Sequence, residues 1–331
     1  MTISIKNVYY LPSGRVFVAK TKDDYLIEFT EMRDVAVDGK LHKEVREETE
    51  ASKIWPHLVD YKDKWLLTVS TQKGCCFNCK FCDVAPLPFK GNLTTQEIID
   101  QIKLILECTP YVTESKKVKI GFARMGEPAF NLDNVLHAIM SLSFISVMMD
   151  RDFTWLPCFN SVLPRKIDLN TTGFDVIDRV IDVKENHYNG FLHFQISCNS
   201  TDENMRHKLF NTTNVLSIEE VVKYINTKTI TNRTVTLNFI VMKDVPVDVE
   251  YLMKLGLNPE KFVVKLIPLN KTVNAENNSL QTYANYSNYE DLVNLADQFA
   301  KYDIPVIYDA IAKCEEAGLC CGQLVHVHQQ G

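Results

Sequence analysis

The chain has no long hydrophobic run and no surplus of glycine or proline. Its longest apolar stretch, residues 135–149, contains a histidine and three serines and is shorter than the roughly 20 apolar residues that span a bilayer. We therefore predict no membrane segment. Only 12 glycines and 12 prolines occur among 331 residues, 46% of which are hydrophobic. These values argue against disorder, collagen-like repeats and low-complexity architecture, and favour a globular protein.

The N-terminus also lacks an apolar segment behind a basic start, so the sequence predicts no secretory signal and a cytoplasmic location. The chain also has no large excess of basic or acidic residues, with 36 of the first and 42 of the second. The net charge of −6 argues against a general nucleic-acid-binding protein, although a local basic channel stays possible.

Ten cysteines in such a chain indicate metal binding or chemistry more than disulfides. Cys75, Cys79 and Cys82 have CxxxCxxC spacing directly after the strand-like segment 65–70. A zinc knuckle or a ferredoxin-type cluster normally needs a fourth protein ligand. Cys76 is the one nearby candidate, and adjacent cysteines rarely bind one metal together. The spacing therefore predicts a 4Fe-4S cluster with one iron open to a ligand from outside the protein.

The sequence divides near residue 60. Residues 3–31 have the short alternating runs and turn residues of β-hairpins. Residues 39–53 are densely charged and predict a solvated helix or loop. We expect a β-rich N-terminal extension with a charged linker over 1–60, and a main domain over 61–331.

From residue 65 onward, strand-like runs alternate with helical periodicity, giving six βα units within 65–302. The predicted fold class is α/β, and both a partial barrel and a doubly wound sheet fit the pattern. In either fold, functional groups gather at the C-terminal ends of the strands. Three helix starts carry capping boxes: Thr94 with Glu97, Ser217 with Glu220, and Ser287 with Glu290.

The cysteine loop and the later Gly126-Glu127-Pro128 together resemble the radical S-adenosylmethionine (SAM) superfamily. The resemblance implies a partial (β/α)6 TIM-like barrel in which SAM binds the open iron of the cluster. Reduction of SAM then yields a 5′-deoxyadenosyl radical. By the same resemblance, Phe81 meets the adenine, and Gly126 and Glu127 contact the amino group of SAM.

A narrower resemblance rests on the segments 70–75, 126–128, 131–134, 196–197 with Arg206, 266–270 and 321–324. In their order and spacing, residues 65–325 resemble the RlmN/Cfr family of RNA adenine methylases. The resemblance implies SAM contacts at Ser197, Asn199 and Asn270, with Asn199 standing where the family usually has histidine, and a further contact at Cys158.

Cys321 matches the cysteine that, in this family, is methylated by one SAM and then carries the methyl group to the adenine. The alternative interpretation of Cys321 is a buried, inert small residue. The family's second cysteine, which resolves the intermediate, is replaced here by Thr68. Cys76, Cys314 and Cys320 are either bystanders or substitutes for it.

Further departures concern the RNA and the general base. The family's basic stretch before the carrier is replaced by 309–313, and its N-terminal RNA-binding domain by about 60 residues. No glutamate aligns with the family's base without gaps. Glu28 and Glu31 are the candidates, and the favoured interpretation of both is a surface carboxylate. Arg124 faces either an anionic substrate or an acidic neighbour. His326 and His328 alternate with valines, which favours a strand with exposed imidazoles over the alternative of a second metal site.

We expect a radical SAM enzyme that methylates an unactivated carbon of a nucleobase, RNA adenine by the resemblance, through a methyl-cysteine at Cys321. The implied cofactors are a 4Fe-4S cluster and SAM, and the implied partners are a reductase or flavodoxin-type electron donor and an RNA or nucleotide substrate. One alternative is an enzyme that uses the radical to abstract hydrogen from a nucleotide, peptide or metabolite. Another is a non-catalytic cluster-containing binding protein, against which the retained Gly126-Glu127-Pro128 argues.

Overall fold

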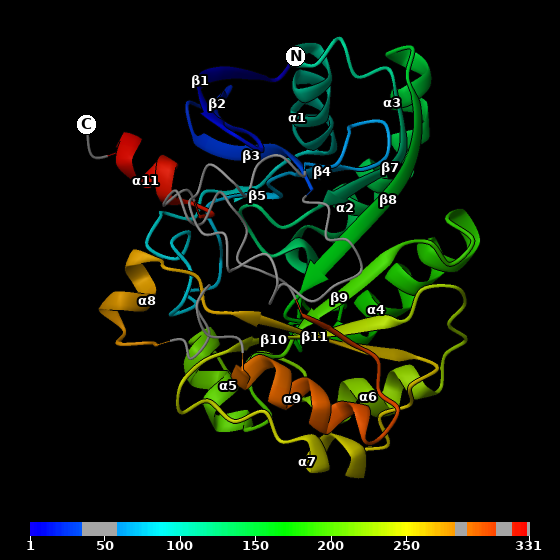
Figure 1. Cartoon of the computed structure of the whole chain (residues 1–331). Helices are drawn as coiled ribbons and strands as arrows, with labels where there is room; N and C mark the ends of the chain where they lie inside the picture. Colours follow the sequence, from blue (N-terminus) through cyan, green and yellow to red (C-terminus); the bar gives the residue numbers. More distant parts are fainter. Residues whose placement is uncertain (35–57, 282–289, 309–319, 330–331) are drawn as a thin grey trace. The chain divides into compact units, whose positions relative to one another are not determined.

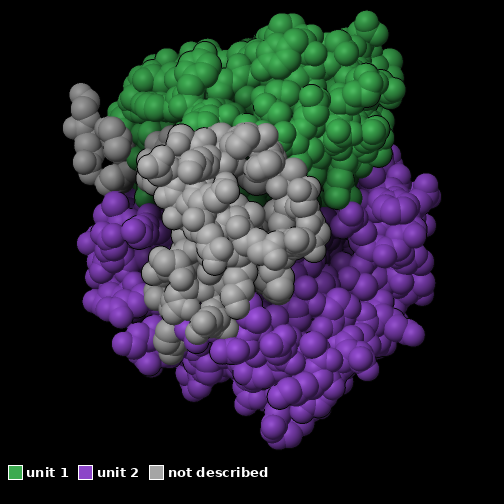
Figure 2. Space-filling view, viewed as in Figure 1, with its two compact units in different colours: residues 1–75, 87–158, 321–331 green, residues 76–86, 159–320 purple. Residues whose placement is uncertain are grey.

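The computed structural model describes residues 1–34, 58–281, 290–308 and 320–329. The chain separates into two compact units, coloured in Figure 2. Unit 1 comprises residues 1–75, 87–158 and 321–331, and unit 2 comprises residues 76–86 and 159–320. The predicted linker over 39–53 lies outside the described residues, so the boundary near residue 60 stays a prediction.

Unit 1 is built on strands in the order β1-β2-β3-β4-β7-β8 (Figure 1). Strands β1 to β4 pair antiparallel, and β4, β7 and β8 pair parallel. The N-terminal region is therefore β-rich, as predicted. The bounds are β1 (Ile3–Leu11), β2 (Gly14–Thr21), β3 (Leu26–Arg33), β4 (Trp65–Thr68), β7 (Glu114–Gly121) and β8 (Asp152–Ser161).

The helices of unit 1 follow its parallel strands. Helix α1 begins at the predicted capping box, in which the Thr94 side chain accepts from the Glu97 amide and the Glu97 carboxylate accepts from the Thr94 amide. Ile98, Ile102 and Ile105 are buried along one face of α1, as its periodicity predicts. The unit contains α1 (Thr95–Cys108), the 3₁₀ turn η3 (Pro128–Asn131), α2 (Leu132–Met140), α3 (Leu142–Met148), α11 (Gln323–Gln329), and the short pair β5 (Gln72–Lys73) and β6 (Gly91–Asn92).

Unit 2 contains the parallel strands β9, β10, β11 and β12 in that order. The strand bounds are β9 (His193–Ser197), β10 (Val235–Val241), β11 (Phe262–Pro268) and β12 (Val306–Tyr308). Its helical elements are α4 (Gly173–Asp182), the π-helical turn η4 (Val183–His187), α5 (Glu203–Phe210), α6 (Ile218–Asn226), α7 (Val249–Lys254), α8 (Val273–Asn277) and α9 (Glu290–Ala300).

The α/β fold class predicted from the sequence is confirmed. Strands and helices alternate from β4 to α9 as six βα units, each within a few residues of its predicted position. The capping box at Ser217 and Glu220 is also present, whereas Ser287 lies outside the described residues. One local prediction is wrong: the segment with His326 and His328 forms the helix α11 and not a strand.

Within the described ranges, no single helix has the length and hydropathy of a membrane span. The bent pair of Pro128–Met140 and Leu142–Met148 reaches those values only when the two helices are taken together, with a 43° bend between them.

Candidate functional site

The second half of the cysteine loop is fixed within unit 2 by the start of α8. The amide of Cys82 donates to the carbonyl oxygen of Cys79 at 3.2 Å, which closes a tight turn. The Nδ2 of Asn274 donates to the carbonyl oxygens of Cys79 (2.8 Å) and Cys82 (3.1 Å). Both cysteines are half-buried, as is Cys75 in unit 1. The backbone of the two cysteines is thus held by an asparagine almost 200 positions later.

The residues between and after these cysteines are anchored in the same way. The Asp83 carboxylate accepts from the amides of Val273 (3.2 Å) and Asn274 (2.8 Å). The Thr272 hydroxyl donates to the carbonyl oxygen of Phe81 at 2.9 Å. Asp83 is buried, so its bonds to two backbone amides satisfy a carboxylate that burial would otherwise penalise. Asp83, Thr272 and Asn274 were not found from the sequence.

Phe81 packs against a hydrophobic cluster of unit 2. Its ring meets that of Phe210 edge-on, with 6.1 Å between the ring centroids. The residue is half-buried, so part of the ring stays accessible to a planar ligand. The buried members of the cluster are Leu209, Met242, Leu269 and Ala275.

Gly126 and Glu127 lie in unit 1 on the loop between β7 and η3. Gly126 has a φ of +100°, and a Cβ at this position would lie 2.6 Å from the Cβ of Gln72 and 2.9 Å from its amide nitrogen. Only glycine fits there. The Glu127 amide donates to Gln72 Oε1 at 2.9 Å, and the buried Glu127 carboxylate accepts from the Ala129 amide at 3.0 Å. The predicted pair is therefore rigidly placed, with Gln72 as its support.

One predicted SAM contact of unit 2, Asn199, is a buried amide side chain, and a second buried amide, Asn238, lies beside it. Asn199 has a φ of +63°. Its side-chain Oδ1 accepts from the backbone amide of Ile240 at 3.3 Å, and its backbone amide donates to the backbone carbonyl of Asn238 at 3.3 Å. In the part of the chain that the structure describes, Asn199 Nδ2 and Asn238 Oδ1 have no hydrogen-bond partner. A buried polar atom left unpaired costs about 1–3 kcal/mol. A polar ligand would satisfy both atoms.

The other predicted SAM contacts are less distinctive. Ser197 is half-buried at the end of β9. Asn270 is half-buried, and its carbonyl accepts from the Thr272 amide at 3.0 Å. Cys158 is buried within β8 and pairs in register with Gly121.

Arg206, which carried part of the resemblance, is a structural residue in unit 2. It is buried, and its Nε donates to the carbonyl of Cys198 at 3.1 Å. Its Nη1 donates to the Glu203 carboxylate at 2.7 Å and to the Leu216 carbonyl at 3.0 Å. Burial raises the pKa of the neighbouring Cys198 to about 12, so that thiol stays protonated at neutral pH.

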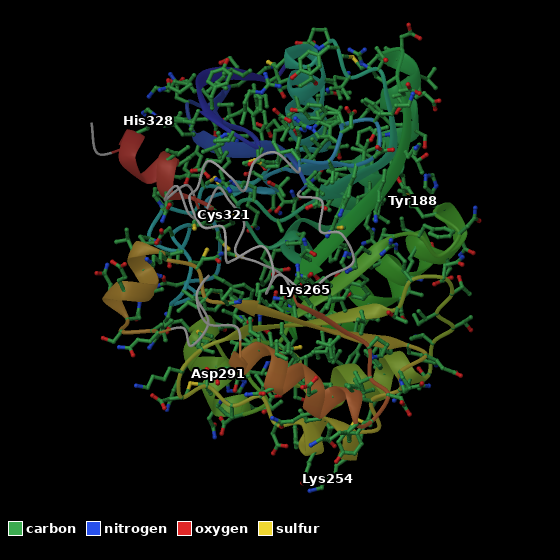
Figure 3. All side chains as sticks on the ribbon, viewed as in Figure 1. Tyr188, Lys254, Lys265, Asp291, Cys321 and His328 are labelled. Atoms are coloured by element: carbon green, nitrogen blue, oxygen red, sulfur yellow. The ribbon has the colours of Figure 1, made fainter. Side chains whose placement is uncertain are left out.

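Cys321, labelled in Figure 3, lies in unit 1, two residues before α11. Arg124 Nη1 donates to the Cys321 Sγ at 3.5 Å. Arg124 also binds the Glu28 carboxylate, with Nη2 at 2.7 Å and Nε at 3.0 Å from Oε2. Glu28 is fully buried, and it accepts from the amides of Gly322 (3.0 Å) and Val325 (2.9 Å). Of the two interpretations of Arg124, the acidic neighbour is therefore present in the structure.

The surface interpretation of both glutamates is wrong. Glu31 is also buried. Its carboxylate accepts from Arg15 Nε at 2.7 Å and from Trp65 Nε1 at 3.0 Å. Thr68, at the place of the resolving cysteine, shares a 2.5 Å hydroxyl–hydroxyl hydrogen bond with Thr30. A threonine hydroxyl cannot form a disulfide.

Within the described ranges, no group of three or more histidine, cysteine and acidic side chains is arranged to hold a metal ion. The donor chemistry of Cys75, Cys79 and Cys82 nevertheless fits an iron–sulfur cluster, since thiolates are the usual protein ligands of such clusters. The Asn274 bonds hold the backbone of two of them in place. The site residues named from the sequence stay predictions as ligands.

The fold is similar to that of a solved radical SAM methyltransferase. A crystal structure of a radical SAM methyltransferase from Sphaerobacter thermophilus matches with a TM-score of 0.69 at 18% identity, over 98% of this chain and 81% of that one. No protein-family model matches the chain.

The chain is also similar in sequence to several proteins that share one name. A protein of Aquifex aeolicus named "Probable dual-specificity RNA methyltransferase RlmN" is 30% identical over 222 residues, which cover 66% of this chain and 59% of that protein. The protein of the same name from Dictyoglomus turgidum is 29% identical over 280 residues, covering 80% and 74%. The one from Chlorobaculum tepidum is 29% identical, covering 60% and 50%.

The predicted resemblance to radical SAM enzymes, and to RlmN within them, is thus confirmed. By fold the chain is similar to a solved radical SAM methyltransferase, and by sequence it is similar to proteins named RlmN. It matches 59% and 50% of the length of the Aquifex and Chlorobaculum proteins.

Proposed function

We propose that the protein is a radical SAM methyltransferase that modifies an unactivated carbon of an RNA nucleobase, with Cys321 as the methyl carrier. The observation that carries the proposal is the contact between Cys321 Sγ and the guanidinium of Arg124. A cysteine that only fills space needs no such partner. A nucleophilic cysteine reacts as the thiolate, and a neighbouring cation stabilises that form.

Cys75, Cys79 and Cys82 would hold the 4Fe-4S cluster, which when bound supplies the electron that cleaves SAM. Glu127 is suited to accept from the ammonium group of SAM, because its carboxylate is fixed beside a glycine that leaves room for a close approach. Within unit 2, the predicted SAM contact Asn199 offers a buried donor, and Asn238 offers a buried acceptor.

The RNA substrate rests on the names of the relatives. The electron donor of the reductase or flavodoxin class, the adenine target and the cytoplasmic location belong to the same proposal. They follow from the resemblance and from the reducing conditions that an iron–sulfur cluster with an open iron requires.

Thr68 favours a second candidate, namely hydrogen abstraction without methyl transfer. A hydroxyl hydrogen-bonded to Thr30 cannot resolve a cysteine-linked intermediate. If Cys321 is the carrier, another thiol must do so. Cys76 is exposed, Cys320 is buried, and Cys314 lies outside the described residues.

The test is anaerobic reconstitution with iron and sulfide, followed by reductant, SAM and RNA, and mass spectrometry of the small products. S-adenosylhomocysteine together with methylated RNA supports the methyltransferase. 5′-Deoxyadenosine without S-adenosylhomocysteine supports hydrogen abstraction instead. The Cys79→Ala variant should retain no stoichiometric 4Fe-4S cluster, and Cys108→Ala should reconstitute like the parent chain. A full cluster in Cys79→Ala would contradict the ligand assignment.

A further inference from the structure

We propose that Arg124 is a positioning residue for Cys321, which orients its Sγ and favours its thiolate form. The Nη1 of Arg124 donates to the Sγ at 3.5 Å, within the range expected of a hydrogen bond to sulfur. The inference rests on the proposed function, in which Cys321 acts as a nucleophile.

Arg124 is held by Glu28 through its side chain and by Val69 through its backbone, so its guanidinium cannot readily move away from the thiol. Two of its nitrogens bind Glu28 Oε2 at 2.7 and 3.0 Å. Its backbone amide donates to the Val69 carbonyl at 3.0 Å. The side chains of Arg124 and Glu28 are 4% and 0% exposed, and at that burial a charged pair is stable only with its full set of hydrogen bonds.

The same carboxylate also fixes the peptide that carries the thiol. Glu28 accepts from the amide of Gly322, directly after Cys321, and from that of Val325 in α11. Glu28 therefore places Arg124 and the Cys321 segment relative to each other. Residues 28, 124 and 321 come from three distant parts of the sequence and meet within unit 1.

The charges around Cys321 have opposite effects on its ionisation. The Arg124 guanidinium, bonded to Sγ, stabilises the thiolate, while the Glu28 carboxylate behind it opposes the negative charge. On α11 the described titratable side chain is His328, whose Nε2 is hydrogen-bonded to Tyr9 Oη and Asn7 Nδ2. Because the arginine contacts the sulfur directly, we expect its effect to exceed that of Glu28. The thiol proton passes to solvent on ionisation.

The experiment measures the rate at which iodoacetamide alkylates Cys321 as a function of pH, in the full chain without cluster or SAM. Alkylation forms the S–C bond and releases iodide, and only the thiolate reacts. Tandem mass spectrometry of the peptide separates Cys321 from Cys320. Arg124→Gln should raise the midpoint of the pH profile by about one unit, which is roughly a tenfold slower reaction below the midpoint. Arg124→Lys, which keeps the charge, should restore more than half of the shift.

Arg124→Gln leaves the Glu28 carboxylate buried without its cation, so that variant can fail to fold. Glu28→Gln with Arg124→Gln replaces the pair by two amides that can bond each other, and its folding is checked by circular dichroism. The double variant should also show a raised midpoint. Arg15→Gln, at the neighbouring buried pair, is the matched control and should leave the Cys321 profile unchanged.

A parental midpoint in both Arg124→Gln and the double variant would overturn the role of Arg124, as would an equal shift in Arg15→Gln. These outcomes do not depend on methyl transfer. If the profile shifts as expected but SAM never methylates Cys321, the role of Arg124 stands and the carrier function fails. If SAM methylates Cys321 and the profile does not shift, the function stands and the role of Arg124 fails.

Discussion

Two glutamates three residues apart on β3 each form a buried ion pair with an arginine beside a cysteine, yet the two sites differ in what the arginine binds. Arg124, held by Glu28, donates to the sulfur of Cys321. Arg15, held by Glu31, donates at 3.0 Å to the backbone carbonyl of Cys108.

The pKa values of Cys108 and Arg15 show how the Glu31 site behaves. Burial raises the pKa of Cys108, and the lowering effect of the Arg15 charge does not outweigh it. For Arg15, burial lowers the pKa, but the hydrogen bond and charge of Glu31 more than compensate, so the pKa of Arg15 is raised overall. A nearby arginine is therefore insufficient to activate a cysteine. A direct bond to the sulfur distinguishes Cys321.

The two sites also differ in what they connect. The Glu31 pair joins the neighbouring strands β2 and β3 and receives Trp65 Nε1 from β4. The Glu28 pair joins β3, the Arg124 loop and the C-terminal segment. The first site connects strands of one sheet, whereas the second connects that sheet to the segment of Cys321, the proposed methyl carrier.

Among the changes that test this comparison, Glu28→Ala should have the largest effect on the free energy of unfolding. The change leaves the Arg124 guanidinium buried without its counter-ion and releases the amides of Gly322 and Val325. Removing one partner of a buried pair costs about 3–5 kcal/mol, so the free energy of unfolding in urea should fall by about that amount. Glu31→Ala should cost less, because Arg15 is 13% exposed and partly hydrated. Equal losses would remove the distinction between the two pairs.

A third buried carboxylate, Glu127, sharpens the comparison because it caps a 3₁₀ turn through the Ala129 amide. Glu127→Gln should keep the fold and weaken SAM binding. Loss of a charge-assisted hydrogen bond costs about 1.5–3 kcal/mol, or roughly a tenfold to hundredfold rise in the Kd. Isothermal titration of the reconstituted protein measures it, and an unchanged Kd would exclude Glu127 from the SAM site.

The smallest effect is expected at the exposed pair of Arg165 and Glu220 in unit 2. The hydrogen bond from Arg165 lowers the pKa of Glu220 from 4.5 to about 2, against the opposing effect of burial. A lowered folded-state pKa contributes stability above pH 4.5 that disappears as the pH falls through 2. Because the side chains are 48% and 32% exposed, Glu220→Gln should cost only about 0.5–1 kcal/mol at pH 7, and less at pH 3. A cost that grows toward low pH would contradict this sign.

Much of the fold could be predicted because its signals are local. The capping boxes at Thr94 and Ser217 and the period of the apolar residues locate helices directly. The strand prediction for the segment around His326 and His328 was wrong. Alternating valines have the period of a strand, but the segment forms a helix, and the Val325 amide in its first turn donates to the Glu28 carboxylate.

The parts of the site that the sequence did not reveal depend on contacts between distant residues. Glu28 and Asn274 were missed because their partners in the site lie at least 96 positions away along the chain. The unpaired Oδ1 of Asn238 could not be predicted either, since the sequence of β10 is that of an ordinary buried strand. The cysteine spacing and Gly126-Glu127-Pro128 were visible because each is contiguous.

The most direct test of the account is the mass of the Cys320–Cys321 peptide after the reconstituted, reduced protein is incubated with SAM in the absence of RNA. One added methyl group, located on Cys321 by fragmentation, is the predicted result. It should be lost in Cys321→Ser and retained in Cys108→Ser, whose arginine binds a carbonyl and not the sulfur. An unmodified Cys321 in the parent chain, or equal methylation of Cys108, would contradict the account.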